Sequence, residues 1–395
     1  MSGITVLELG SLIAAPFATR LLGDFGARVI KVEGLQGDPL RQWGAPHPDK
    51  GTSYWSLVQS RNKELVAIDL HKPEGAALVR KLAESVDIVV ENFRPGRLEE
   101  WGIGFQQLKD ANPDLIMVSI SGYGQTGPYR HRPGFGNIAE SMGGLRAVTG
   151  YENGEPLRVG VSLGDQVASL YAVVGALLAL QARRQGGGGE HVDVALTEAV
   201  FSLTEAALTE YDVTGNIPQR AGNRLHRAAP SGVWKTKDEG WIAIGANGDS
   251  IFSRFAQAIG HPEWRDDAEL QTNAGRVKRV EWLEQEIGQW AASQTMEEAM
   301  AALVAAEVPA GPVYTIREIA SDPHFKERGA VTSFSWEEAD EIIAMPGVVP
   351  KLNEHPGSIR FVHEAIGQDT ARVLSEILAL SDSDIEQLRQ DGVIR

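Results

Sequence analysis

The first 120 residues alternate between short apolar runs and longer amphipathic segments. The apolar runs have the length of strands and cover residues 4–9, 28–33, 65–70, 86–91 and 115–120. The segments between them carry apolar residues at helical spacing, at residues 16–25, 76–84 and 105–112. Strand–helix–strand units of this kind form right-handed crossovers in a parallel sheet. The sequence therefore predicts a doubly wound α/β domain whose ligands bind outside the carboxyl ends of the strands.

The turn after the first predicted strand weighs against a nicotinamide-dependent enzyme. A dinucleotide-binding domain would show a similar pattern, including an acidic residue such as Glu33 at the end of the second strand. However, the turn at residues 10–15 contains a single glycine, Gly10, where the phosphate-binding fingerprint needs several.

A change in composition divides the chain. Residues 213–229 are polar and Arg-rich, and the next segment reads as a β-hairpin followed by helical patterns. We therefore expect residues 1–212 and 325–395 to form a large α/β domain, and residues 213–324 to form linkers and a small α+β domain. The helical pattern at residues 197–211 predicts one long helix before the change.

The composition excludes several classes of protein. A net charge of −16 argues against non-specific binding to nucleic acid, which needs clustered cations. The chain has no cysteine, which excludes disulfides, thiolate nucleophiles and cysteine–metal sites, and no histidines have metal-site spacing. The N-terminus lacks the pattern of a signal peptide, and the longest apolar run, residues 170–180, is too short to span a bilayer. We therefore expect a cytoplasmic protein with no metal and no membrane partner.

One carboxylate, Asp165, stands at the start of a helical pattern that is apolar on nearly every side, as in a buried helix. An aspartate before a helix is a good N-cap. The same helix N–H groups also favour an ionised carboxylate that could act as a nucleophile. The preceding Gly164 would let a bulky ligand approach. The residues alone allow both roles.

Five basic residues lie in loops of the predicted α/β domain. They are either solvated surface charges or a set that converges on phosphates. These residues are Arg41, Lys72, Arg94, Arg97 and Arg132.

Two segments of the second region also have alternative interpretations. Arg220, Arg224, His226 and Arg227 predict a solvated linker, or a site for an acidic substrate if they face Asp165. Residues 245–249 form either a simple turn before a helix or a series of backbone donors for an oxyanion or a carboxylate.

Several short motifs together resemble the class III CoA-transferase family, whose members include formyl-CoA transferase, carnitine CoA-transferase and the α-methylacyl-CoA racemases. The motifs are Lys72-Pro73-Glu74-Gly75, Glu91-Asn92-Phe93-Arg94-Pro95-Gly96, Gly122-Tyr123-Gly124-Gln125-Thr126-Gly127-Pro128-Tyr129, Leu163-Gly164-Asp165 and Asp384-Ile385-Glu386-Gln387-Leu388. The resemblance covers nearly the whole chain. It implies a Rossmann-like large domain, a small α+β domain joined by two linkers, and an interlocked homodimer.

The resemblance also implies the roles of individual residues. It places the nucleophilic aspartate at Asp165, and the glycine loop that covers the active site at residues 245–249, with Gly245, Asn247 and Gly248 at the substrate. CoA enters as an acyl-CoA substrate, and no cofactor is tightly bound. The implied CoA contacts, to which the charge argument adds Lys72 and Arg97, are Ile13, Ala14, Ile68, His71, Asn92, Phe93, Arg94, Arg132 and Phe135.

Departures from the family pattern narrow the expected reaction. Ile13 replaces a glutamine, and Phe135-Gly136 replaces a Tyr-Glu pair, of formyl-CoA transferase. The racemases carry a proton-transferring histidine where Phe135 stands. The segments 133–137 and 247–252 are most similar to transferases that use succinyl-CoA with a dicarboxylate or a hydroxy-dicarboxylate.

We therefore expect CoA transfer through an aspartyl anhydride and an aspartyl-CoA thioester. The alternatives are an acyl-CoA racemase or dehydratase, a formyl-CoA:oxalate CoA-transferase, and a CoA-binding protein without activity.

Overall fold

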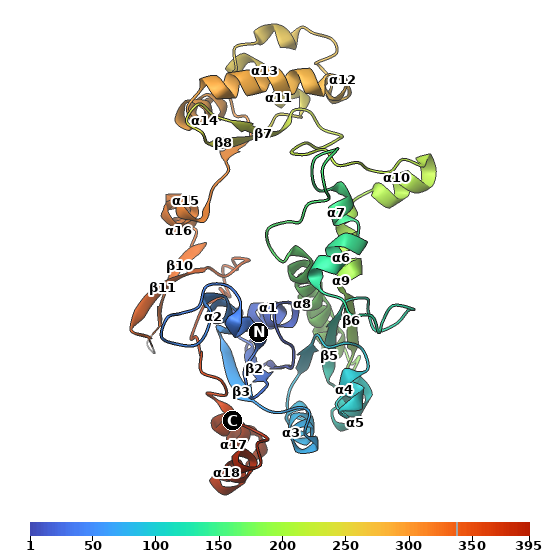
Figure 1. Cartoon of the computed structure of the whole chain (residues 1–395), viewed down its shortest axis with the longest axis vertical. Helices are drawn as coiled ribbons and strands as arrows, with labels where there is room; N and C mark the ends of the chain where they lie inside the picture. The colour runs from blue at the N-terminus through green and yellow to red at the C-terminus, as the bar shows by residue number, and fades with distance from the viewer. Residues whose placement is uncertain (337–338) are drawn as a thin grey trace. The chain divides into compact units, whose positions relative to one another are not determined.

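The computed structural model describes residues 1–336 and 339–395 (Figure 1). The chain folds as two compact units. The first unit comprises Met1–Leu145, Val159–Val213 and Pro323–Arg395, and the second comprises Arg146–Arg158 and Thr214–Asp322. The short segment Arg146–Arg158 therefore packs with the second unit. The domain boundaries expected from the sequence, at residues 213 and 324, stay a prediction.

The first unit contains the parallel sheet that the alternating pattern predicts. The sheet has six strands in the order β3-β2-β1-β4-β5-β6, and every neighbouring pair is parallel. This order places a topological switch point between β1 and β4, where open α/β sheets bind ligands. The strands are β1 (Thr5–Glu8), β2 (Arg28–Glu33), β3 (Lys63–Ala67), β4 (Ile88–Glu91), β5 (Ile116–Ser121) and β6 (His191–Ala195).

Helices cover both faces of this sheet, because alternate strand residues face opposite sides. Leu7 of β1 packs into one hydrophobic core and its neighbour Val6 into the other. The Leu7 core includes residues of α3 (Pro73–Ala83), α5 (Phe105–Ala111), α17 (Thr370–Leu378) and α18 (Asp382–Gln390). The Val6 core includes residues of α1 (Ala14–Asp24), α6 (Gly136–Met142), α8 (Leu163–Arg184) and α9 (Leu196–Phe201). The predicted doubly wound α/β fold is thus confirmed.

Helix α8 is not buried on all sides, contrary to the sequence interpretation. Its buried face consists mainly of alanines, which allow close packing against α1 and the sheet. Its other face exposes Leu170, Tyr171, Val174, Leu177 and Leu178. By length and composition, α8 is also the one described helix that could cross a membrane, although the run at residues 170–180 alone is too short. An apolar pattern cannot by itself tell which side of a helix the fold covers.

The single helix predicted at residues 197–211 is wrong. Helix α9 ends at Phe201, a 3₁₀ turn covers Ser202–Thr204, and α10 runs from Ala207 to Thr214. Between the two helices, Glu205 has a φ of 52°, which is left-handed and cannot continue a right-handed helix. The helical spacing of apolar residues carries no signal for such a break.

The second unit contains the predicted hairpin. Strands β7 (Ser231–Lys235) and β8 (Trp241–Gly245) are antiparallel, and β9 (Ala310–Pro312) adds to β8. Ile242 and Ile244 pack into a core with residues of α11 (Asp249–Ala258), α13 (Val280–Ser293) and α14 (Met296–Ala305).

The remaining described elements belong to either unit. They are α2 (Tyr54–Ser60), α4 (Arg97–Glu100), α7 (Leu145–Val148), α12 (Asn273–Lys278), α15 (Ile316–Ser321), α16 (Pro323–Glu327), β10 (Val331–Trp336), β11 (Glu341–Pro346) and the 3₁₀ helices Pro39–Gln42 and Pro262–Arg265.

Candidate functional site

Asp165 lies in the first turn of α8 and is partly exposed. The N-cap is Ser162, so the interpretation of Asp165 as the N-cap is wrong. A side chain in the first turn still lies beside N–H groups that have no partner within the helix, at the positive end of the helix dipole. This position favours negative charge, which a carboxylate needs in order to act as a nucleophile.

Two glycines bring the starts of α6 and α8 into contact. A Cβ atom at Gly136 would lie 2.2 Å from Asp165 Oδ2, and one at Gly164 would lie 3.0 Å from the Gly136 carbonyl oxygen. Gly164 is buried, and its N–H donates to Glu140 Oε1 at 3.3 Å. Gly164 therefore serves the packing of two helices, and the interpretation that it leaves room for a ligand is wrong. Gly136, which lies against the carboxylate, sets the position of Asp165.

A buried serine connects the Asp165 helix to the first turn of α1. The Ser169 hydroxyl lies 2.7 Å from the carbonyl oxygens of both Ala14 and Asp165. Because Ala14 begins the helix that follows the inner strand β1, this contact ties the candidate nucleophile to the candidate CoA-binding turn.

The loops that leave β1 and β4 are joined at the topological switch point. The Ser11 N–H donates to Asn92 Oδ1, and Asn92 Nδ2 donates to the Ser11 carbonyl oxygen, both at 2.9 Å. The fold thus brings Ile13 and Ala14 close to Asn92 and Phe93. These residues are far apart in the sequence and follow two neighbouring parallel strands.

Three of the predicted CoA contacts have side chains in the protein core. Ile13 and Ala14 are buried, and Ile68 is inaccessible to solvent. The Ile68 N–H donates to the Glu33 carbonyl oxygen at 2.9 Å. The side chains of these three residues therefore offer little or no surface to a ligand in this conformation.

An aromatic cluster at the carboxyl ends of β3 and β4 contains a residue that the sequence interpretation missed. The rings of His71 and Phe93 meet Trp101 edge-on, at centroid distances of 5.2 and 5.3 Å. The Arg97 guanidinium lies 5.8 Å from the Trp101 ring centroid. His71 is 79% exposed, so one side of the cluster faces solvent. A tryptophan one helical turn after Arg97 was the available signal for this position.

The predicted basic residues do not form one group. Arg94 and Arg132 are exposed, and the Arg132 guanidinium stacks 3.6 Å from the Tyr129 ring centroid. Lys72 Nζ donates to the Asp391 carbonyl oxygen near the C-terminus. Arg41 is buried and forms two hydrogen bonds to Glu33, at 2.8 and 3.0 Å. Arg41 is therefore a structural residue, and its proposed contact with phosphate is wrong.

A buried polar network, also missed from sequence, fixes the turn after β1. Lys31 Nζ donates to Glu8, to Asp38 and to the Gly10 carbonyl oxygen, at 2.7, 2.8 and 3.1 Å. Asp38 in turn accepts the N–H of Leu12, a residue with a φ of 64°. Burial lowers the pKa of the neighbouring Lys63 to about 8, although Glu8 opposes the shift. A left-handed leucine persists only where its surroundings impose it, as they do in this turn.

The predicted substrate loop lies in the second unit. Gly245 ends β8, Asn247 lies in the turn, and Gly248 is the N-cap of α11. Gly248 has no side chain to accept the first N–H groups of the helix, which leaves these donors for a ligand or solvent. Phe135, a predicted CoA contact, is 65% exposed in the first unit.

The arginine-rich linker is more ordered than the sequence suggests. The Arg220 guanidinium donates to the carbonyl oxygens of Tyr151 and Gly154, at 3.2 and 3.0 Å. Arg224 forms an ion pair with Glu284 at 3.6 Å. These contacts join both arginines to other segments of the second unit, so the interpretation of them as part of a solvated linker is wrong.

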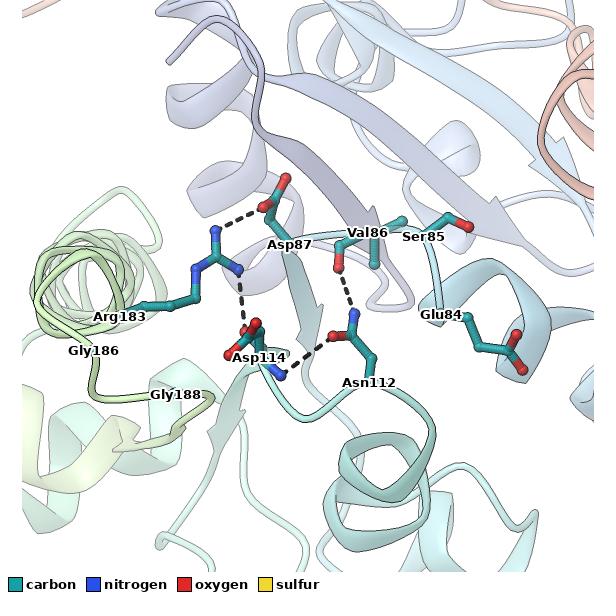
Figure 2. Close-up of a pocket in the computed structure, with 9 residues that line it drawn as sticks. All are labelled: Glu84, Ser85, Val86, Asp87, Asn112, Asp114, Arg183, Gly186 and Gly188. Carbon is teal, nitrogen blue, oxygen red and sulfur yellow. Dashed lines mark hydrogen bonds and ion pairs between the residues drawn. The ribbon is translucent and has the colours of Figure 1, made fainter.

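A hollow of about 600 Å³ lies at the opposite, amino end of the sheet (Figure 2). Arg183 reaches across it to Asp87 at 2.6 Å and to the Asp114 carbonyl oxygen at 3.1 Å. Its described lining includes none of the predicted site residues. Within residues 1–336 and 339–395, no three His, Asp or Glu side chains are placed to hold a metal ion.

Comparison with known families identifies the class of protein. The chain matches the model of CoA-transferase family III over residues 1–370 and belongs to this family. It is a class III CoA-transferase, as the resemblance of its sequence motifs predicts.

Individual relatives are similar along their whole length. The chain is 44% identical to succinyl-CoA–D-citramalate CoA-transferase of Chloroflexus aurantiacus, covering 100% of this chain and 98% of that protein. It is 33% identical to mouse succinyl-CoA:glutarate CoA-transferase, covering 100% and 90%. The crystal structure of a CaiB/BaiF family protein from Brucella suis matches with a TM-score of 0.84 at 30% identity, covering 95% and 98%.

Proposed function

We propose that this enzyme transfers CoA from succinyl-CoA to a dicarboxylic or hydroxy-dicarboxylic acid, with Asp165 as the nucleophile. The observation that carries this proposal is the partly exposed Asp165 carboxylate, held in the first turn of α8 against the Cα atom of Gly136. The names of the relatives support succinyl-CoA as the donor and a C4 or C5 dicarboxylate as the acceptor.

The reaction consists of four acyl transfers. Asp165 attacks the succinyl-CoA thioester, which gives a succinyl–aspartyl anhydride and CoA thiolate. The thiolate attacks the aspartyl carbonyl and releases succinate, leaving an aspartyl-CoA thioester. The acceptor carboxylate attacks this thioester, and the returning thiolate attacks the acceptor carbonyl of the new anhydride. The products are the new acyl-CoA and the regenerated carboxylate of Asp165.

Each step passes through an oxyanion, which backbone N–H groups can stabilise. The first turn of α8 supplies such groups beside Asp165, and the loop at Gly245, Asn247 and Gly248 supplies others. Phe135 has no proton to transfer, which disfavours racemisation. The absence of the Tyr-Glu pair at Phe135-Gly136 disfavours formyl-CoA and oxalate as substrates.

For CoA itself, we propose a site along the carboxyl ends of β1, β3 and β4. The backbone of Ile13, Ala14 and Ile68 would border the ligand. The aromatic and basic side chains beyond these strands would contact its nucleotide part, since guanidinium and ammonium groups pair with phosphates. These side chains are His71, Lys72, Phe93, Arg94 and Arg97, joined by the amide of Asn92 and by Arg132 from the loop after β5.

We further propose a cytoplasmic homodimer. The exposed apolar face of α8 borders a groove of about 380 Å³, lined by Tyr171, Val174, Leu178 and residues of β6 and α9. Contiguous apolar surface of this kind marks an interaction site, and the interlocked dimer implied by the family resemblance would cover it.

The test is a reaction of succinyl-CoA with D-citramalate, L-malate or glutarate, followed by mass spectrometry of the thioester products. Asp165→Ala removes the nucleophile, so we expect the transfer rate to fall by more than about 1,000-fold. The wild type should carry a CoA adduct on Asp165 that is absent from the variant. As a control, Asp110→Ala removes an exposed carboxylate of α5 that accepts a hydrogen bond from Gln106 on the same helix. An active Asp165→Ala variant would disprove the mechanism.

A further inference from the structure

In the described part of the chain, the backbone hydrogen bonds of the loop between β8 and α11 lie at its two ends. The N–H groups of Gly245 and Ala246 donate to the carbonyl oxygens of Pro309 and Pro230, at 2.9 and 3.0 Å. On the other side, the Phe252 N–H donates to the Gly248 carbonyl oxygen at 2.7 Å. A loop with two glycines at its ends needs a further constraint to adopt one conformation.

Arg276 of α12 supplies that constraint. Its side chain is 0% exposed, and Nη2 donates to the Asn247 carbonyl oxygen at 2.5 Å and to Asp249 Oδ1 at 2.7 Å. The same guanidinium donates to two further carbonyl oxygens and lies 4.6 Å from the Phe252 ring centroid. The two further acceptors are Ala229 at 2.8 Å and Leu270 at 2.7 Å. One buried side chain thus fixes both the middle and the end of the loop.

The chemistry of this contact requires arginine. A guanidinium presents five donors in a rigid plane, whereas a lysine ammonium presents three on a flexible stem. Burying a charge is costly, and replacing a buried ion pair by apolar residues is often neutral or stabilising. The Asp249 partner is 62% exposed, so the ion pair alone contributes little to stability. What the arrangement does provide is one defined position for the Asn247 carbonyl and for the start of α11.

We infer that Arg276 is a positioning residue, which holds the Gly245–Asn247–Gly248 loop in the conformation that binds the carboxylate of the acid substrate. This inference rests on the proposed function, in which that loop contacts the substrate. The free acid lacks the CoA moiety, so it depends on the loop for a larger share of its binding than succinyl-CoA does.

A matched pair of arginines makes the test specific. Arg279, three residues after Arg276, also forms an ion pair, with Asp267 at 2.6 Å, and stacks 4.2 Å from the Trp282 ring centroid. In the described part of the chain, the hydrogen bonds and ion pairs of Arg279 and Asp267 join residues outside the loop. The variants Arg276→Lys and Asp249→Ala are therefore compared with Arg279→Lys and Asp267→Ala.

Two quantities are measured in the full-length enzyme. Hydrogen exchange followed by mass spectrometry reports on the amides of residues 245–252, and steady-state kinetics give KM for the dicarboxylate acceptor and for succinyl-CoA. For Arg276→Lys and Asp249→Ala we expect exchange and acceptor KM to rise at least tenfold, with kcat and the succinyl-CoA KM changed less than threefold. Both control variants should stay within twofold of the wild type.

The outcomes separate this inference from the proposed function. If the wild type transfers CoA and the two test variants leave either loop exchange or acceptor KM unchanged, the positioning role is disproved. If the wild type transfers no CoA to any acid, the proposed function fails and the inference fails with it. Should Arg276→Lys not fold, Asp249→Ala decides alone, because its carboxylate is largely exposed and its loss spares the core.

Discussion

At the scale of single residues, Gly136 leaves open the space that the Asp165 carboxylate occupies in this chain. A Cβ atom on residue 136 would lie 2.2 Å from Oδ2 of Asp165. No real pair of atoms tolerates that distance, so any side chain at position 136 must displace Asp165. The Phe135-Gly136 pair, which departs from the pattern of formyl-CoA transferase, therefore affects the position of the nucleophile through the space at Gly136.

We predict that Gly136→Ala lowers kcat by about 100-fold, because a displacement of about 1 Å at a reacting group costs that much. The thermal unfolding midpoint should change little, since alanine favours the first turn of α6. The control is Gly34→Ala, because a Cβ at Gly34 meets no atom within 4 Å. The measurement is CoA transfer under saturating succinyl-CoA, and a Gly136→Ala enzyme with wild-type kcat would contradict the assigned position of Asp165.

Single-residue chemistry could be predicted only where the signal was local. Asp165 stood out because an acidic residue beside glycine precedes a long apolar helix. The buried pairing of Arg41 with Glu33, the Gly136 contact and the role of Arg276 all depend on neighbours brought together by folding. A basic residue in a loop looks the same in sequence whether it binds a phosphate or a buried carboxylate.

At the scale of elements, polar side chains connect the three adjacent strands β4, β5 and β6. Glu91 of β4 is fully buried, forms a hydrogen bond with Ser119 of β5, and accepts the Phe93 N–H at 2.7 Å. Ser119 Oγ also lies 2.9 Å from Nε2 of His191 in β6. Burial raises the pKa of Glu91 to about 7. The hydrogen bonds from Ser119 and from the Phe93 N–H oppose this shift, and the charges of Glu99 and Asp193 add to it.

This raised pKa predicts a pH-dependent contribution to stability. The folded state binds the Glu91 proton more tightly than the unfolded state, because the pKa of Glu91 is higher in the folded state. The resulting stabilisation is fully present below pH 4.5 and is lost as the pH rises to and through 7. A shift of this size corresponds to about 3 kcal/mol. The Glu91→Gln variant has no titrating group at this position and does not show this loss. Relative to the variant, the wild type should therefore lose about 2–3 kcal/mol of unfolding free energy between pH 4.5 and pH 8.

The measurement is urea unfolding at four pH values between 4.5 and 8. Glu100→Gln, which alters a carboxylate whose side chain is 65% exposed, is the control and should follow the wild type at every pH. Parallel curves for wild type and Glu91→Gln would show that Glu91 does not titrate in this range.

The elements themselves were largely predictable. Strands β1 to β5 overlap the short apolar runs of the sequence, because parallel strands buried on both faces are mostly apolar. The edge strand β6, with the exposed Asp193, has no such run. The same argument failed for α8, because an all-apolar helix is expected to be buried all round, and periodicity cannot identify a missing partner. It also failed at Glu205, where a single left-handed residue ends a helix that the pattern continues.

At the scale of the whole molecule, one chain carries candidate site residues in two compact units. Asp165 and the CoA-binding candidates lie in the first unit, and the loop held by Arg276 lies in the second. The first unit also exposes a band of large apolar side chains along α8, with Leu178 at 66%. Burying a leucine contributes about 1.5–3 kcal/mol, so several such residues could supply much of the energy of a stable interface.

We therefore predict that Leu178→Asp weakens a homodimer. The wild type should sediment at twice the mass of the chain, and the variant should raise the dissociation constant at least 100-fold, because each subunit would bury an unpaired charge in the interface. Sedimentation velocity over a range of concentrations measures this constant. The control is Ile342→Asp, which alters a side chain of β11 that is 78% exposed and lies outside the α8 face. If the wild type sediments as a monomer, or if Leu178→Asp leaves the dimer intact, the apolar face of α8 is not the contact between subunits.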